Sequence, residues 1–133
     1  MCRCNRYLAI DGDQVGRLLE KRILLNEENA IVGLSEGIRS LFSRLGQMLE
    51  SSGMKVLINA GDMVLARGDV TPEIVACIRS YRGPVPFSWG IGSSLRLAHI
   101  ALRVAKARGG GKVIEAIGDL AEDLVFSEVS PTG

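Results

Sequence analysis

The chain has 133 residues, of which 47% are hydrophobic and 23% are charged, and its formal net charge is +1. This length and composition fit one globular domain and exclude long-range disorder. The balanced charge excludes a strongly basic surface for DNA, and the apolar runs are too short to span a bilayer. Because the N-terminus lacks the pattern of a secretory signal, we expect a cytoplasmic protein that binds no DNA and does not insert into a membrane.

The first elements in chain order are a short strand and two helices. Residues 6–11 form an apolar run that predicts a buried strand, and residues 14–22 follow as a helix. The polar segment 26–29 interrupts this pattern. Apolar residues at three- and four-residue spacing then predict a long amphipathic helix over 30–51, which ends at Ser52-Gly53.

A β-hairpin is predicted next. Its strands cover residues 55–59 and 63–67, and the turn between them is Ala60-Gly61-Asp62. Gly61 permits the positive φ that tight turns often need.

The second half of the chain predicts a helix, a strand, a second helix and a second strand. Thr71-Pro72 is a helix-start signal, because Thr suits the N-cap and Pro the first helical position, and this helix runs to about residue 82. A strand over 87–92 follows. The next helix covers 95–108, and a last strand covers 112–116.

The segment after residue 116 is ambiguous, with a short helix possible over 119–124 and an end, 130–133, that should fray. The elements follow the order β-α-α-β-β-α-β-α-β. This order predicts an α+β ferredoxin-like palm, with a central, mainly antiparallel sheet and helices on one face. We expect a single domain over 1–133, with a core over about 6–116 and a tail over 117–133.

Two acidic turns, Asp11-Gly12-Asp13 and Ala60-Gly61-Asp62-Met63, each follow an apolar strand. Carboxylates at the ends of buried strands are costly unless something binds them. In the predicted topology the third strand inserts between the first and the second, which places Asp11 beside the hairpin that carries Asp62. Converging carboxylates suit divalent cations, and such a site suits phosphoryl or nucleotidyl transfer.

Each acidic turn also has a simpler interpretation. The turn Asp11-Gly12-Asp13 stands before a predicted helix, where Asp is a common N-cap. Asp62 is acceptable as an ordinary turn residue. The metal interpretation therefore depends on the two turns meeting in the fold.

Three segments carry a resemblance to a known family. The sequence Tyr7-Leu8-Ala9-Ile10-Asp11-Gly12-Asp13-Gln14-Val15-Gly16, the hairpin Ile58-Asn59-Ala60-Gly61-Asp62-Met63-Val64, and the strand-helix unit from Phe87 to Gly109 occur in this order. They resemble the palm domain of GGDEF diguanylate cyclases and CRISPR polymerases, and most closely the minimal CRISPR polymerases. The resemblance covers about residues 6–116.

The resemblance implies roles for particular residues. Asp11 and Asp62 would be the catalytic acids that coordinate two Mg²⁺ or Mn²⁺ ions, with the Gly12 carbonyl as a backbone ligand. Lys106 would contact the triphosphate, although a lysine near the end of a helix is also consistent with a solvated surface residue. Lys112 is a second, weaker phosphate candidate.

Four further residues are candidates for nucleotide binding. Asp13 and Gly61 belong to the two acidic turns. Ser93 and Ser94 open the helix over 95–108, whose amide groups could meet an anion. Plain helix capping explains the two serines equally well.

The sequence departs from the family pattern at three positions. Ala60 replaces the first hairpin glycine, which is tolerated if its φ is negative, and Met63 replaces the second acid of the hairpin. Asp13 either compensates for the missing acid or caps the following helix. Leu19 stands where diguanylate cyclases carry a guanine-reading Asn, and Leu offers no hydrogen bond to a base, so the resemblance favours ATP.

These expectations lead to a hypothesis and two alternatives. The hypothesis is a cyclase that joins ATP into a cyclic di- or oligoadenylate by a two-metal mechanism, works as a homodimer, and signals to a downstream effector in anti-phage defence. The first alternative is a degenerate nucleotide-binding sensor, motivated by Met63. The second is a ferredoxin-like RNA-binding module, which the low aromatic content of 5% disfavours.

Overall fold

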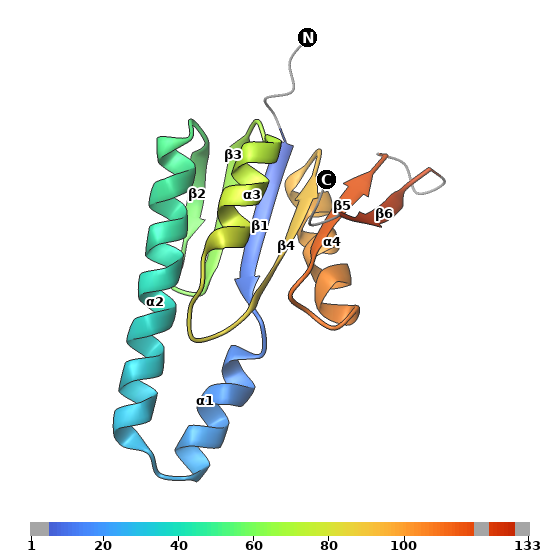
Figure 1. The fold of residues 1–133 in the computed structure, drawn as a ribbon. Helices are drawn as coiled ribbons and strands as arrows, with labels where there is room; N and C mark the ends of the chain where they lie inside the picture. Colours follow the sequence, from blue (N-terminus) through green and yellow to red (C-terminus); the bar gives the residue numbers. More distant parts are fainter. Residues whose placement is uncertain (1–5, 119–122, 130–133) are drawn as a thin grey trace.

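The computed structural model describes residues 6–118 and 123–129. These residues form a six-stranded sheet with the order β2-β3-β1-β4-β5-β6 and four helices (Figure 1). All neighbouring strands are antiparallel except β4 and β5, which are parallel. The strands are β1 (Arg6–Gly12), β2 (Lys55–Asn59), β3 (Met63–Gly68), β4 (Phe87–Gly92), β5 (Val113–Ile117) and β6 (Val125–Glu128). The helices are α1 (Val15–Leu24), α2 (Glu28–Ser51), α3 (Pro72–Ser80) and α4 (Leu95–Ala107).

The predicted α+β class and the mainly antiparallel sheet are confirmed. The third strand lies between the first and the second, as the split arrangement requires. The boundaries of β2 and β4 are those that the sequence predicts, whereas α2 begins at Glu28 rather than residue 30 and α3 ends at Ser80 rather than residue 82.

The helices cover both faces of the sheet, so the prediction that they lie on one face is wrong. Side chains alternate along β1, and Leu8 and Ile10 join the main core with residues of α2 and α3. Ala9 points to the other face, where it packs with Ala98 and Leu102 of α4. Figure 1 shows α4 behind the sheet and α2 and α3 in front of it.

Glycines in β4 allow α4 to approach the sheet closely. A Cβ atom added at Gly90 would lie 2.3 Å from the carbonyl oxygen of Ala98 and 2.3 Å from the amide nitrogen of Leu102. One added at Gly92 would lie 2.6 Å from the amide nitrogen of Ala98. Because no real Cβ fits at these distances, the two glycines fix where α4 sits and therefore where its last turn, with Lys106, ends.

The sheet has one strand more than the sequence predicted. Strand β6 pairs antiparallel with β5 and extends the sheet by a sixth strand. It has only four residues, several of which are exposed, so its sequence shows no clear alternation of apolar and polar residues that would predict a strand. Most of the possible helix over 119–124 lies outside the described residues. The predicted fraying end over 130–133 lies wholly outside them.

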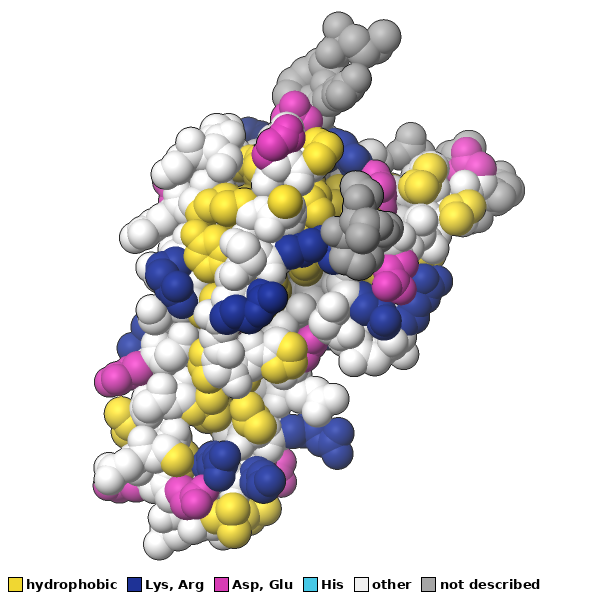
Figure 2. All heavy atoms as spheres, in the orientation of Figure 1, with side chains coloured by type: hydrophobic (Ala, Val, Ile, Leu, Met, Phe, Trp, Pro, Cys, Tyr) yellow, Lys and Arg dark blue, Asp and Glu magenta, His cyan; other side chains and the backbone are white. Residues whose placement is uncertain are grey.

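Helix α1 and the first half of α2 form a helical hairpin that extends beyond the end of the sheet (Figure 1). No residue of α1 is buried, and Leu24 is 76% exposed. Figure 2 shows yellow hydrophobic side chains at this end together with basic and acidic ones, and further yellow side chains over the upper part of the face. None of the helices in the described ranges combines the length and apolarity needed to cross a bilayer.

Candidate active site

The two acidic turns meet at the end of β1. Asp11 is paired with Met63 of β3 on one side and with Ser88 of β4 on the other. The amide of Gly12 donates a hydrogen bond to the carbonyl oxygen of Asp62 at 3.1 Å. The predicted convergence of Asp11 and Asp62 is therefore present in the fold. It arises because β1 pairs with β3, the strand that directly follows Asp62.

The hairpin turn has the backbone conformation that its glycine allows. Gly61 has a φ of 85°, in the left-handed region. Among the described non-glycine residues a positive φ occurs at Gln14 and Asn26, and not at Ala60. Ala60 therefore meets the condition of a negative φ, and the turn places Asp62 next to Asp11.

Asp11 is a partly buried carboxylate whose charge is incompletely balanced. Its side chain is 30% exposed, and Oδ2 lies 3.2 Å from the Nζ of Lys106. Burial raises the pKa of Asp11 above its ordinary value; Lys106 opposes this shift, and the neighbouring charge of Asp62 adds to it. A bound cation would relieve both the burial cost and the repulsion from Asp62.

The oxygen atoms at this edge fit a hard divalent cation. The Lys106 ammonium donates to the Gly12 carbonyl oxygen at 2.7 Å and pairs with Asp11, so a positive charge already contacts two of the three predicted ligands. Among the described residues no group of three or more His, Cys, Asp or Glu could hold a metal ion. Mg²⁺ often takes only one or two carboxylates, with waters and substrate phosphates as the other ligands. The donor set of Asp11, Gly12 and Asp62 therefore fits Mg²⁺ or Mn²⁺.

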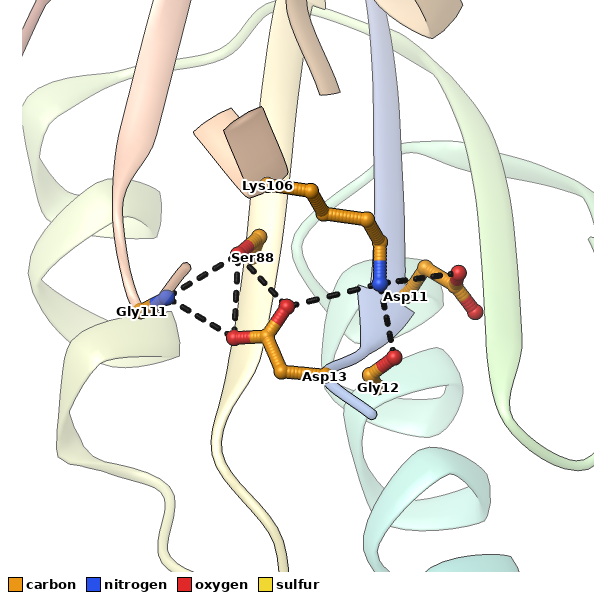
Figure 3. A network of polar contacts seen from close by, with 6 residues as sticks. All are labelled: Asp11, Gly12, Asp13, Ser88, Lys106 and Gly111. Atoms are coloured by element: carbon orange, nitrogen blue, oxygen red, sulfur yellow. Dashed lines mark hydrogen bonds and ion pairs between the residues drawn. The ribbon is translucent and has the colours of Figure 1, made fainter. Parts of the chain in front are cut away.

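Asp13 lies in a closed polar network on the other side of β1 (Figure 3). Its side chain is 9% exposed. The Ser88 hydroxyl, at 2.8 Å from Oδ1 and 3.0 Å from Oδ2, donates to this carboxylate, and the Gly111 amide donates to Oδ2 at 2.8 Å. Lys106 pairs with Oδ1 at 3.4 Å. Groups of the protein itself thus satisfy both oxygens of the Asp13 carboxylate.

The capping interpretation of Asp13 is wrong. The N-cap of α1 is Gln14, which has a left-handed φ of 55° and makes no side-chain cap hydrogen bond. With its carboxylate buried against Ser88, Gly111 and Lys106, Asp13 does not offer a free acid in place of Met63 either.

Comparison with known proteins identifies the family. Residues 7–116 match the model of the minimal CRISPR polymerase domain, mCpol. The chain belongs to the mCpol family. No curated protein matches the chain.

A solved structure is similar to this mCpol chain in fold. The crystal structure of the adenylyl cyclase CyaB from P. aeruginosa matches with a TM-score of 0.55 and 12% sequence identity, over 96% of this chain and 95% of that one. At this identity the likeness concerns the fold alone. The family match and the shared fold together support a palm-type domain of the CRISPR-polymerase class.

Lys106 is brought to the acidic edge, beside Asp11 and Gly12. It lies in the last turn of α4, and its amine contacts Asp11, Gly12 and Asp13. The interpretation of Lys106 as a solvated helix lysine is therefore wrong.

Two other predicted nucleotide-binding residues, Ser93 and Ser94, lie away from the acidic edge, whereas Lys112 follows Gly111 at the same end of the sheet but directs its ammonium to another partner. Ser93 and Ser94 follow the far end of β4, about 17 Å along the strand from Ser88 at 3.3–3.4 Å per residue. Ser94 caps α4 by accepting a hydrogen bond from the amide of Leu97. The Lys112 ammonium pairs with Glu128 of β6 at 3.8 Å.

Ser88 and Gly111 are site residues that the sequence analysis missed. Ser88 is a polar residue that is fully buried in an otherwise apolar strand. A buried serine in such a strand requires a polar partner. Gly111 belongs to a triplet of glycines with positive φ, which could have indicated a loop built to bring its backbone near another group. Neither signal identifies Asp13 as that partner.

A cleft of about 590 Å³ adjoins the network on the α3 side of the sheet. Gly111 lines both the cleft and the Asp13 network. The volume of this cleft is within the range of small-molecule binding sites. The other lining residues are Arg79, Tyr81, Arg82, Gly83, Val85, Pro86, Phe87, Trp89 and Val113.

Proposed function

We propose that this mCpol chain is a metal-dependent nucleotidyltransferase that joins ATP into a cyclic di- or oligoadenylate and releases pyrophosphate. The observation that carries this proposal is the convergence of Asp11, the Gly12 carbonyl and Asp62 at one sheet edge, with the Lys106 ammonium beside them. Carboxylates and a cation in this arrangement suit a substrate that brings both phosphates and a metal ion.

Each residue has a distinct role in the proposed reaction. Asp11, Gly12 and Asp62 would hold Mg²⁺ or Mn²⁺. When bound, the metal would lower the pKa of the attacking hydroxyl and neutralise the charge of the leaving group. Lys106 binds triphosphate oxygens, for which a lysine ammonium is a common partner. The Gly61 turn keeps the Asp62 carboxylate beside Asp11.

The proposed reaction is a substitution at the α-phosphorus of ATP. A ribose hydroxyl of one nucleotide attacks this phosphorus, a new phosphodiester P–O bond forms, and the bond to pyrophosphate breaks. The hydroxyl proton passes to solvent, so the chain needs no side-chain general base. Leu19, at the position that reads guanine in diguanylate cyclases, supports adenine over guanine because it offers no hydrogen bond to a base.

The proposed product determines the proposed assembly. One chain carries one acidic edge, whereas closing a cyclic dinucleotide requires two nucleotides placed face to face. We therefore expect a homodimer with the acidic edges opposed, acting in anti-phage signalling through an effector that senses the product.

A nucleotide-binding sensor without turnover is the second candidate. Met63 stands in the hairpin where the family pattern has an acid, and Asp13 does not replace that acid. A site with one carboxylate fewer could bind ATP and a metal ion without completing the reaction.

The experiment that separates the two candidates is product analysis by mass spectrometry. Purified protein is incubated with ATP and either Mg²⁺ or Mn²⁺, beside Asp62→Ala and the control Asp69→Asn, which changes an exposed carboxylate that follows the far end of β3. The cyclase proposal expects a cyclic adenylate and pyrophosphate from wild type and Asp69→Asn, and none from Asp62→Ala. Intact ATP with both ions, from folded protein that binds ATP, would overturn it and favour the sensor.

A further inference from the structure

The Lys106 ammonium is shared between two sets of oxygen atoms. On one side it lies 3.2 Å from Asp11 Oδ2 and 2.7 Å from the Gly12 carbonyl oxygen. On the other side it lies 3.4 Å from Asp13 Oδ1. The first set consists of groups that would hold the metal ion, and the second does not. Figure 3 shows the amine between the two carboxylates.

A divalent cation and an ammonium group cannot both contact Asp11 and Gly12 without strong repulsion, since like charges a few ångströms apart are unfavourable. Metal binding would therefore weaken the contacts of Lys106 on that side. Without a second anchor, the flexible four-carbon stem of lysine would let the amine move into solvent.

Asp13 has the properties of such an anchor. Ser88 and Gly111 hold both of its oxygens, and Gly111 also donates to the Ser88 hydroxyl at 3.0 Å, which closes a triangle of hydrogen bonds. A Cβ atom at Gly110 would lie 2.8 Å from Asp13 Oδ2, so the glycine loop packs against the carboxylate with no room for a side chain at this position. The carboxylate is therefore fixed before any ligand arrives.

We propose that Asp13 is a positioning residue, which holds Lys106 at the site when a divalent cation takes over Asp11 and the Gly12 carbonyl. The lysine is then retained beside the incoming triphosphate and is not lost to solvent. This inference rests on the proposed function, because it requires a metal ion and a triphosphate at the acidic edge. It assigns Asp13 to neither the metal ligands nor the direct nucleotide contacts.

The test is a double-mutant cycle on nucleotide affinity. The ligand is α,β-methylene ATP with Mg²⁺, in which the bond that would break is blocked, so the affinity does not depend on turnover. Calorimetry compares wild type, Asp13→Asn, Lys106→Met and the double variant. Asp69→Asn serves as the matched control, since it removes a carboxylate charge in the same way from an exposed position after β3.

We expect Asp13→Asn to weaken binding about tenfold, the fold-change that corresponds to one charge-assisted hydrogen bond. In the Lys106→Met background, Asp13→Asn should change the affinity by less than about twofold, because the residue through which Asp13 acts is gone. The affinity for AMP, which lacks the β- and γ-phosphates, should be the same in wild type and Asp13→Asn.

Two further measurements keep the test decisive. Ser88→Ala, which leaves Asp13 its charge and its Gly111 bond, should give a smaller loss in the same direction if Asp13→Asn is too unstable to measure. Nucleotide-free protein titrated with Mn²⁺ and followed by electron paramagnetic resonance should bind Mn²⁺ more tightly in Lys106→Met than in wild type, because the competing ammonium is gone.

Independent, multiplying losses for Asp13→Asn and Lys106→Met would overturn the positioning role, as would equal losses for AMP and the triphosphate. Either result leaves the proposed function intact if the protein makes a product from ATP. A wild-type protein that binds no triphosphate would overturn both.

Discussion

The end of β1 separates two regions that hold carboxylates in different ways. On the β4 side, Asp13 is buried and bound by Ser88, Gly111 and Lys106. On the β3 side, Asp11 is 30% exposed, and burial together with Asp62 raises its pKa. The carboxylate of the first region is satisfied by groups of the protein. The carboxylate of the second region is suited to binding an exchangeable ligand.

Lys106 connects the two regions, and the position of α4 determines where it lies. The helix can approach β4 only because Gly90 and Gly92 have no side chains. The same packing therefore supplies the amine to both carboxylates. Changes on the open side should alter activity more than stability, and changes on the closed side or beneath α4 should do the reverse.

The largest expected effect is on the open side. Asp11→Asn should lower product formation about 1,000-fold, because loss of metal-based charge stabilisation costs several kcal/mol in the transition state. The far-UV circular dichroism spectrum should be unchanged. Initial rates of pyrophosphate release measure the effect, and a rate within threefold of wild type would remove Asp11 from the metal site.

The next effect is beneath α4. Gly90→Ala should lower the free energy of unfolding by about 2–3 kcal/mol, because its Cβ would overlap the α4 backbone. Gly33→Ala is the matched control, since Gly33 lies in α2 with nothing within 4 Å of an added Cβ, and it should stabilise the protein by about 1 kcal/mol. Urea denaturation measures both. Equal stabilities for the two variants would contradict the close packing.

A smaller effect is expected on the closed side. Ser88→Ala should lower the free energy of unfolding by about 1–2 kcal/mol, because Asp13 loses a donor in a buried position. Ser80→Ala removes an exposed hydroxyl that bonds to the Cys77 carbonyl, and its effect should stay within about 0.5 kcal/mol. A Ser88 variant as stable as the Ser80 variant would mean that the triangle does not fix Asp13.

The smallest effect is the pH dependence that Asp11 contributes to stability. Because the pKa of Asp11 is raised in the folded state, its contribution is fully present below the pKa of the unfolded chain and is lost as pH rises through the folded pKa. Asp11→Asn should therefore flatten the loss of stability of metal-free protein in the acid range above pH 4. Thermal unfolding in EDTA measures this. A steeper profile in the variant would give the opposite sign and refute the interpretation.

The sequence predicted the open side better than the closed one. The two acidic turns are recognisable because each follows an apolar strand, and the split topology alone brings them together. Ser88 and Asp13 are 75 positions apart, and no local pattern connects them. Strand β6 is too short to show a period. Helices on both faces were missed because the small residues Ala9 and Gly90, which admit α4, give no strong hydrophobic signal.

The most direct test of the division between an open and a closed carboxylate is a crystal structure with Mn²⁺ and α,β-methylene ATP, with the metal located from its anomalous scattering. We expect Mn²⁺ to be bound by Asp11, Asp62 and the Gly12 carbonyl, and Lys106 to be displaced from Asp11 but still beside Asp13. Mn²⁺ bound by Asp13, or held by the phosphates without Asp11 and Asp62, would contradict the division between an open and a closed carboxylate.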